Sequence, residues 1–375
     1  MKLVWATVLT SQLTHSTEHS IPKVFECSCL LDDGTQGSAV VYSDLVGEVH
    51  ENDRVLLNTT AVELALGTGG KHFVVARVAA GQEARGVALN APSPHGGHIM
   101  KLRYTPMQRD VLSVESQESP WHRTMERAVD LDHIPVVCCG LHSQVPLVAA
   151  AIKARAPHLR VGYVMTDQAA LSLDFSQIVS QAKEKGLIDV TVATGQAFGG
   201  DYEAINVHSG MLAACHVGGC DVLIVAIGPG VAGTGTPFGH GGVAQGEAIN
   251  AVGALEGLPI ACVRMSFADE RERHRVISHH TMAALENVAL TKALVALPHL
   301  EDEEQAALLN EKLSQFVNSC GHEAVQLEES VYDEAALKGL RVTTMRRGYD
   351  EDPVFFEAAF AAGALAAQVA SEREG

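Results

Sequence analysis

Glycine is concentrated in one stretch of this sequence, and glycine-rich loops are a common way for proteins to hold phosphate or carboxylate groups. Eight glycines lie between Gly228 and Gly246, directly after the apolar segment 221–227. Glycine lets backbone N–H groups approach a ligand closely, and a helix beginning near Gly242 adds the positive end of its dipole. We therefore predict that this loop binds an anionic small molecule or nucleotide, with contacts from Gly228, Gly230, Gly233, Thr234, Gly235, Thr236 and His240.

The loop departs from the two common nucleotide-binding motifs. It lacks the GK[ST] ending of a P-loop, and its glycine spacing differs from the GxGxxG dinucleotide fingerprint. It also follows the fourth expected strand of its domain, whereas those motifs follow the first. Two other interpretations of the loop stay open: a lid or tightly packed turn, and a contact between subunits.

Further polar residues follow the other apolar segments in this part of the chain. If these segments are strands of one parallel sheet, their carboxyl ends meet at one edge, which is where such sheets bind ligands. At this edge we predict ligand contacts from Ser143, Gln196 and Ser266, and acid–base catalysis by His142 and Asp167. The alternatives are a hydrogen-bonded structural histidine at His142 and a helix cap at Ser143, because no GxSxG motif surrounds this serine.

The abundance of histidine also raises a metal hypothesis. His208 and His216 lie eight residues apart and His279 and His280 are adjacent, so neither pair has the i, i+4 spacing of a helical metal site. We assign no metal ligand from the sequence. An alternative ligand set gathered from different strand ends consists of His142, Asp167, His240 and Asp201.

The elements that position these residues alternate between apolar runs and helical patterns from Ile134 onward. Uniformly apolar strands that alternate with helices predict a parallel sheet covered on both faces, a Rossmann-like α/β fold. A final alanine-rich helix is expected from Pro353 to about Ser371. The expected strands lie at 135–139, 160–165, 189–193, 221–227, 259–265 and 292–297.

The first part of the chain has a different pattern. Five short runs rich in Val, Thr, Phe and Leu are separated by turn residues, which predicts a small all-β barrel or sandwich. We divide the chain into this β domain over 1–85, a connecting segment over 86–130 and the α/β domain over 131–375.

Composition and charge exclude several classes of partner. A formal net charge of −18 disfavours nucleic acid and anionic membranes. The eight cysteines include no CxxC pair, and most lie in apolar runs, which is typical of buried reduced thiols. The N-terminus shows neither a cleavage site nor an apolar stretch long enough to span a membrane, so we expect a cytoplasmic protein. We expect it to form a homo-oligomer.

Several segments spread over most of the chain resemble an uncharacterised bacterial family, a domain of unknown function found mainly in Gram-positive lineages. The resemblance implies a bacterial cytoplasmic protein and assigns no activity or cofactor. The segments that carry it are Leu56–Ala61, Leu66–Gly70, Met100–Pro106, Gly228–Thr236 and Val342–Met345.

Three functional hypotheses remain. The first is an enzyme acting on an anionic metabolite or nucleotide, in which the glycine-rich loop holds the anion and His142 and Asp167 move protons. The second is a non-enzymatic ligand sensor or assembly protein, because the sequence matches no catalytic signature. The third is a metal-dependent hydrolase. Whether the protein is an enzyme is left open, since this architecture supports many functions.

Overall fold

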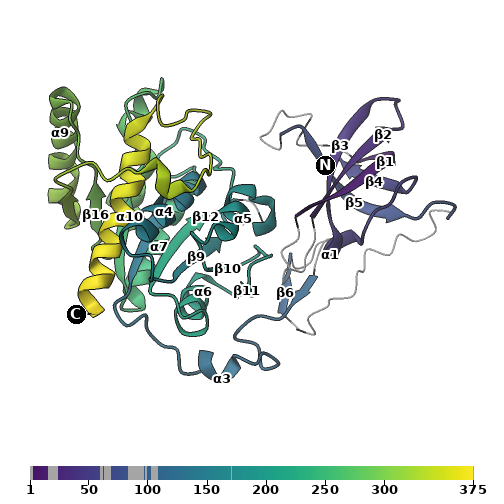
Figure 1. The fold of residues 1–375 in the computed structure, drawn as a ribbon, viewed down its shortest axis with the longest axis horizontal. Coiled ribbons are helices and arrows are strands. Elements are labelled where there is room, and N and C mark those ends of the chain that lie inside the picture. Colours follow the sequence, from purple (N-terminus) through teal and green to yellow (C-terminus); the bar gives the residue numbers. More distant parts are fainter. Residues whose placement is uncertain are drawn as a thin grey trace. The chain divides into compact units, whose positions relative to one another are not determined.

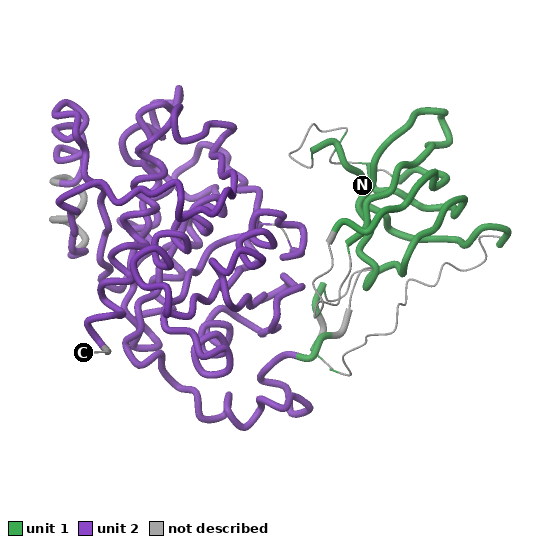
Figure 2. Tube along the Cα trace, in the orientation of Figure 1, with its two compact units in different colours: residues 1–112 green, residues 113–375 purple. Residues whose placement is uncertain are grey.

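The computed structural model describes residues 3–15, 24–59, 62, 69–82, 97, 99–102, 109–169 and 171–374. Contacts between residues divide the chain into two compact units, Met1–Leu112 and Ser113–Gly375 (Figure 2). Each unit has a hydrophobic core of its own. Much of the predicted connecting segment, 86–96 and 103–108 included, lies outside the described residues.

The first unit is a small closed β-barrel, as the sequence predicts (Figure 1). Its strands are β1 (Leu3–His15), β2 (Val24–Leu31), β3 (Gln36–Tyr42), β4 (Arg54–Asn58) and β5 (Lys71–Val78). They close in the order β1-β2-β3-β5-β4, with β3 and β5 parallel and the other neighbours antiparallel. With the short helix α1 (Ser43–Val46) between β3 and β4, this is the Greek-key order of OB-fold barrels.

Alternating burial explains why these segments form a barrel. Along β5 every second residue is buried, so Val74, Ala76 and Val78 point inward while their neighbours are half-buried. Val8 and Leu57 join them in the barrel core. Two further strands of this unit, β6 (Ile99–Lys101) and β7 (Arg109–Val111), pair with each other as a separate antiparallel ribbon.

The second unit contains an eight-stranded sheet in which all neighbouring strands are parallel. In spatial order the strands are β11 (Tyr202–Glu203), β10 (Val190–Ala193), β9 (Val161–Thr166), β12 (Val222–Ile227), β8 (Pro135–Cys139), β13 (Leu258–Cys262), β16 (Leu294–Leu297) and β17 (Glu323–Gln326). The central strands are buried at nearly every residue, since both faces of the sheet are covered. The predicted parallel α/β architecture is confirmed.

Helices cover both faces of the sheet. The core on one face includes residues from α4 (Val145–Arg155), α5 (Gln177–Glu184) and α10 (Pro353–Glu374). The core on the other face includes residues from α6 (Val207–Leu212), α7 (Ala244–Ala254) and α9 (Glu303–Cys320). The short helix α8 (His279–Ala283) continues into a π-helical turn, Ala284–Val288, whose Leu285 packs into this second core.

The strand order has a switch point at the middle of the sheet. The strand β12 lies between β9 and β8, whereas the dinucleotide-binding order keeps the first two strands adjacent. The chain leaves β8 toward α4 on one face, but it leaves both neighbours of β8, β12 and β13, toward α7 and α8 on the other. Adjacent strands whose connections diverge in this way leave room for a ligand beyond their carboxyl ends.

The long helix α10 belongs to the core of this unit. By length and composition, Pro353–Arg373 would be long and apolar enough to cross a membrane, but 83% of that window is buried. It packs against α4, where Gly363 allows the two helices to approach closely. Burial against its own unit accounts for the apolar character of this helix.

The contact at Gly363 gives a first prediction. Ala at this position favours the helix by about 1 kcal/mol, yet its Cβ would lie 2.4 Å from the Val148 carbonyl oxygen and 2.7 Å from the Ala151 Cβ. Backbone cannot move aside as a flexible side chain can, so the cost of overpacking, about 1–3 kcal/mol, should exceed the gain in helix propensity. A contact of 2.4 Å with a backbone oxygen should cost about 2–3 kcal/mol, so after the gain in helix propensity we expect Gly363→Ala to lower the free energy of unfolding by about 1–2 kcal/mol, measured by urea unfolding and far-UV circular dichroism.

Gly348→Ala is the matched control, because a Cβ at Gly348 would have no neighbour within 4 Å. Its stability should equal that of the wild type within error. A Gly363→Ala protein as stable as the wild type would show that α4 and α10 are not in tight contact.

Candidate functional site

The candidate site lies beyond the carboxyl ends of β12, β8 and β13. The glycine-rich loop follows β12, a 3₁₀ turn with His142 and Ser143 follows β8, and Arg264 and Ser266 follow β13. Because these strands are neighbours in a parallel sheet, three of the predicted polar segments emerge along one edge.

The glycine-rich loop folds back on itself as a small hydrogen-bonded hairpin. Gly233 and His240 form an antiparallel bridge, and the Thr234 N–H donates to the Gly239 carbonyl over 2.8 Å. The Thr234 hydroxyl contacts the Thr236 hydroxyl at 2.9 Å and also donates to the Gly239 carbonyl. The threonine hydroxyls are therefore engaged within the loop, and their predicted contact with a ligand stays a prediction.

Exposure differs along the loop. Gly228 is buried at the end of β12, whereas the residues from Ala232 to Phe238, Gly235 among them, are exposed, as is Gly230. The chain becomes buried again at His240. The part of the loop that returns into the protein thus carries His240, whose imidazole can take part in chemistry.

Four histidines meet where this loop returns. His240 stacks on His280 with 3.9 Å between ring centroids and 10° between ring planes. His279 lies beside both, at 5.4 Å from His240 and 4.3 Å from His280. His274, in a 3₁₀ turn, lies 4.8 and 5.0 Å from His279 and His280. We call these four residues the histidine cluster.

Burial keeps the histidine cluster uncharged at neutral pH. Burial lowers the pKa of His280 to about 3, with a smaller effect from the neighbouring histidines. Burial, together with the charges of Arg264 and Arg271, lowers the pKa of His274 to about 3. The pKa values of His240 and His279 are lowered for the same main reason. Neutral imidazoles keep one nitrogen lone pair each.

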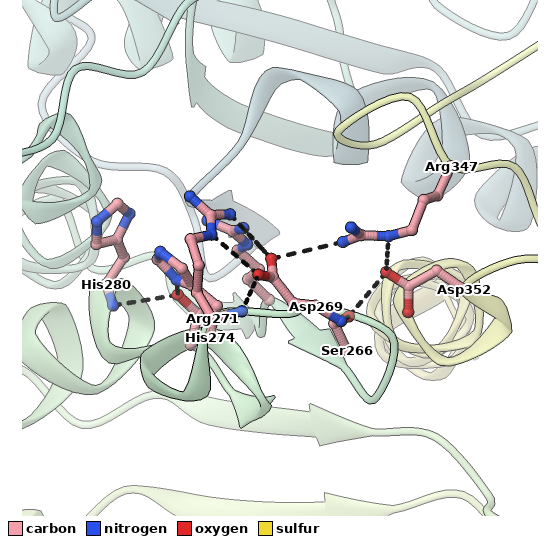
Figure 3. A network of polar contacts seen from close by, with 9 residues as sticks. Ser266, Asp269, Arg271, His274, His280, Arg347 and Asp352 are labelled. Atoms are coloured by element: carbon pink, nitrogen blue, oxygen red, sulfur yellow. Dashed lines mark hydrogen bonds and ion pairs between the residues drawn. The ribbon is translucent and has the colours of Figure 1, made fainter.

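Beside the histidine cluster lies a network of three arginines and two aspartates (Figure 3). Arg271 contacts both carboxylate oxygens of Asp269 at 2.9 Å. Arg264 and Arg347 reach the same carboxylate at 3.2 and 3.5 Å. Arg347 also pairs with Asp352 at 3.1 Å. We call these five residues the arginine network.

Ser266 completes the arginine network. Its hydroxyl donates to the Asp352 carboxylate at 2.8 Å and accepts from the Asp269 N–H at 3.0 Å. The side chain is buried, so the structure gives this predicted ligand-binding serine a role in holding two carboxylates. A direct contact of Ser266 with a ligand stays a prediction.

The arginine network shifts the ionisation of its members. Hydrogen bonds from Arg271 hold the pKa of Asp269 well below its usual range, and the charge of Arg264 lowers it further. Burial lowers the pKa of Arg264 to about 10, although the charge of Asp269 opposes this shift. With every member charged, three guanidinium groups face two carboxylates, so the network carries an excess positive charge.

His142 is held by both of its ring nitrogens. Nδ1 lies 3.2 Å from the Tyr163 hydroxyl and Nε2 lies 2.6 Å from the Ser176 hydroxyl. Burial lowers the pKa of this imidazole to about 4. These contacts favour the structural alternative for His142, and its predicted role as a general base stays a prediction.

The other predicted residues are placed by backbone contacts. The Asp167 carboxylate accepts from the Gln196 N–H at 2.8 Å, which joins the loops after β9 and β10. Ser143 lies inside the 3₁₀ turn His142–Gln144, ahead of α4, and is half-buried. The structure thus brings Asp167 and Gln196 together, while the hydrogen bonds of His142 go to other residues.

Sequence reasoning missed the buried glutamine Gln245. Its amide nitrogen donates to the carbonyl oxygens of Cys138 and Cys262, both at 2.8 Å, and so pins the ends of β8 and β13. This fixes the orientation of the amide, and its buried oxygen has no hydrogen-bond partner. The buried hydroxyl oxygen of Thr166, at the end of β9, also lacks one. Buried polar atoms are normally satisfied, and no group of the described residues satisfies these two.

Comparison with known proteins gives a family and no activity. A family model described as a protein of unknown function (DUF3866) matches residues 38–363, which cover most of both units. No curated protein matches the chain.

The burial of His142 predicts a pH-dependent loss of stability. The folded-state pKa of about 4 lies below the unfolded value of about 6.5, so stability is complete above pH 6.5 and falls as the pH drops toward 4. Between about pH 8 and pH 5 this group alone should cost about 2 kcal/mol. In His142→Gln, which cannot titrate, the decline in unfolding free energy over this range should be smaller by that amount.

Urea unfolding at both pH values measures the difference. The other buried histidines titrate in wild type and variant alike, so they cancel. Equal declines in the two proteins would show that His142 is accessible to solvent protons in the folded state.

Proposed function

We propose, for a chain that belongs to the DUF3866 family, that the α/β unit binds a small anionic molecule at the carboxyl edge of its parallel sheet. The observation that carries the proposal is the excess positive charge of the arginine network, which lies beside the end of β13 in a chain of net charge −18. Three arginines share these two carboxylates, so an anion bound at the network would balance its charge.

Arg271 is the member of the network best placed to meet that anion. Its side chain is 40% exposed, whereas those of Arg264 and Asp269 are buried. A guanidinium group already aligned by Asp269 presents its remaining N–H groups in a fixed direction, and planar guanidinium groups suit carboxylate and phosphate oxygens.

The unpartnered atoms at the same edge support a ligand with polar groups besides the anion. The Gln245 amide oxygen can only accept, so it suits a hydroxyl or N–H group of the ligand. The Thr166 hydroxyl can accept or donate. Sugar phosphates and nucleotides combine an anion with such groups, which agrees with the hypothesis of an anionic metabolite or nucleotide.

The location, activity and assembly of the protein are further proposals. Seven cysteines of the described residues are free thiols, which supports the proposed cytoplasmic location in a bacterium. We retain the enzyme hypothesis with His142 and Asp167, the sensor hypothesis, and a homo-oligomeric assembly as proposals of lower rank. Binding of the anion is common to the first two, so it is the step to test.

The test compares charged ligands with their uncharged analogues. We expect sugar phosphates or nucleotides to raise the melting temperature of the full chain, while the matching sugars and nucleosides do not. Titration calorimetry should then show a dissociation constant that rises about 10- to 100-fold in Arg271→Gln, as expected for the loss of a charge-assisted hydrogen bond.

Arg155→Gln is the matched control, because this exposed arginine ends α4 at the opposite edge of the sheet. Its affinity should equal that of the wild type. The proposal fails if uncharged analogues bind as well as the charged ligands, or if Arg271→Gln binds the anion with unchanged affinity.

A further inference from the structure

Three members of the histidine cluster have the arrangement of metal ligands. Among the residues that the structure describes, His240, His279 and His280 each offer one ligand atom, and these atoms lie within 4.8 Å of one another. In a tetrahedral zinc site with bonds of about 2.0–2.1 Å, ligand atoms lie about 3.3 Å apart. To reach this spacing the stacked rings of His240 and His280 must turn out of their parallel arrangement, so that both lone pairs point at one ion.

The hydrogen bonding of His240 fixes which nitrogen is free. Its Nε2 lies 3.0 Å from the Pro237 carbonyl oxygen, which can only accept, so Nε2 carries the proton. Nδ1 then keeps its lone pair, and it is buried without a hydrogen-bond partner. A carbonyl that holds the far nitrogen of a histidine is the usual support behind a metal ligand.

The other two histidines also have ring nitrogens without partners. Neither ring nitrogen of His279 has a hydrogen-bond partner, and Nδ1 of His280 lacks one as well. With His240 this makes four buried nitrogens close together that no group of the described residues satisfies. Each costs desolvation energy unless something binds it, and a single cation bound by one lone pair from each ring would satisfy three of the four.

Glycine keeps the space beside these nitrogens open. A Cβ at Gly242 would lie 3.0 Å from Nδ1 of His240 and equally close to the Cβ of His280. The return of the glycine-rich loop against α8 thus depends on the absence of a side chain at this position. The loop brings His240 to two histidines that are distant in sequence.

We propose that His240, His279 and His280 form a binding site for one divalent transition metal ion of the zinc class. Uncharged imidazole nitrogens suit Zn²⁺, Ni²⁺ and Cu²⁺, whereas Mg²⁺ and Ca²⁺ prefer oxygen ligands. Three protein ligands leave the fourth position of a tetrahedral ion open, as in catalytic zinc sites. This proposal does not rest on the proposed anion binding, because the metal ligands are histidines and none of them belongs to the arginine network.

The test measures the metal directly. The full chain is stripped with a chelator, dialysed and titrated with Zn²⁺ against a chromogenic chelator, and with Co²⁺ for its visible absorption. We expect one ion per chain and the intense absorption of tetrahedral Co²⁺. His279→Ala should weaken Zn²⁺ binding by about 100-fold or more and abolish that absorption.

His279→Ala is chosen because the ring of His279 makes only a weak contact with the Arg273 backbone, so its removal disturbs little and the variant should fold. Far-UV circular dichroism and the melting temperature check the fold, and His280→Ala provides a second ligand variant. His208→Ala removes an exposed histidine on α6 and should bind Zn²⁺ like the wild type.

Three outcomes overturn the proposal. These are no tight uptake of Zn²⁺ or Co²⁺, equal affinity in wild type and both ligand variants, and a loss in His208→Ala that matches theirs. Because the arginine network is intact in these variants, anion binding measured in parallel separates a failure of the metal site from a failure of the proposed function.

Discussion

Three arginine side chains converge on the carboxylate of Asp269, which is 2% exposed. Through them Asp269 joins the end of β13, the loop that carries His274, and the segment that leads into α10. A buried carboxylate left without any partner costs about 3–5 kcal/mol, and three guanidinium groups keep Asp269 paired even when one of them is removed. The position of the segment from β13 to α8 therefore depends on the Asp269 carboxylate. This segment carries His274, His279 and His280.

Much of the fold could be predicted because burial leaves a strong pattern. Strands such as β8 and β12 are apolar on both faces, and the sequence shows this directly. The edge strand β17 was missed because its residues are mostly exposed, and β11 because it has two residues. The order of strands could not be predicted, since nothing local in β12 specifies its two neighbours.

The site was less predictable because tertiary contacts assemble it. The adjacent pair His279–His280 fails the spacing rule for two ligands on one helix, and its third neighbour, His240, comes from a loop. Asp269 lies in a run of alternating charges that is typical of a solvated surface, and only the fold buries it. By contrast, a general rule on parallel strands was enough to select the carboxyl edge of the sheet as the place to look for a site. The arginine network and the histidine cluster both lie at this edge.

The insertion of β12 between β8 and β9 also bears on how the chain folds during synthesis. The strands β8 and β9 are made early, but each forms hydrogen bonds with β12, which is made only after β10, β11 and α6. Until residues 222–227 leave the ribosome, the growing sheet consists of two pieces: β8, with neither of its neighbours β12 and β13, and β9 with β10 and β11, whose β9 edge has no partner. We therefore expect this unit to fold late and in one step. Until then its exposed strand edges would be a binding site for chaperones.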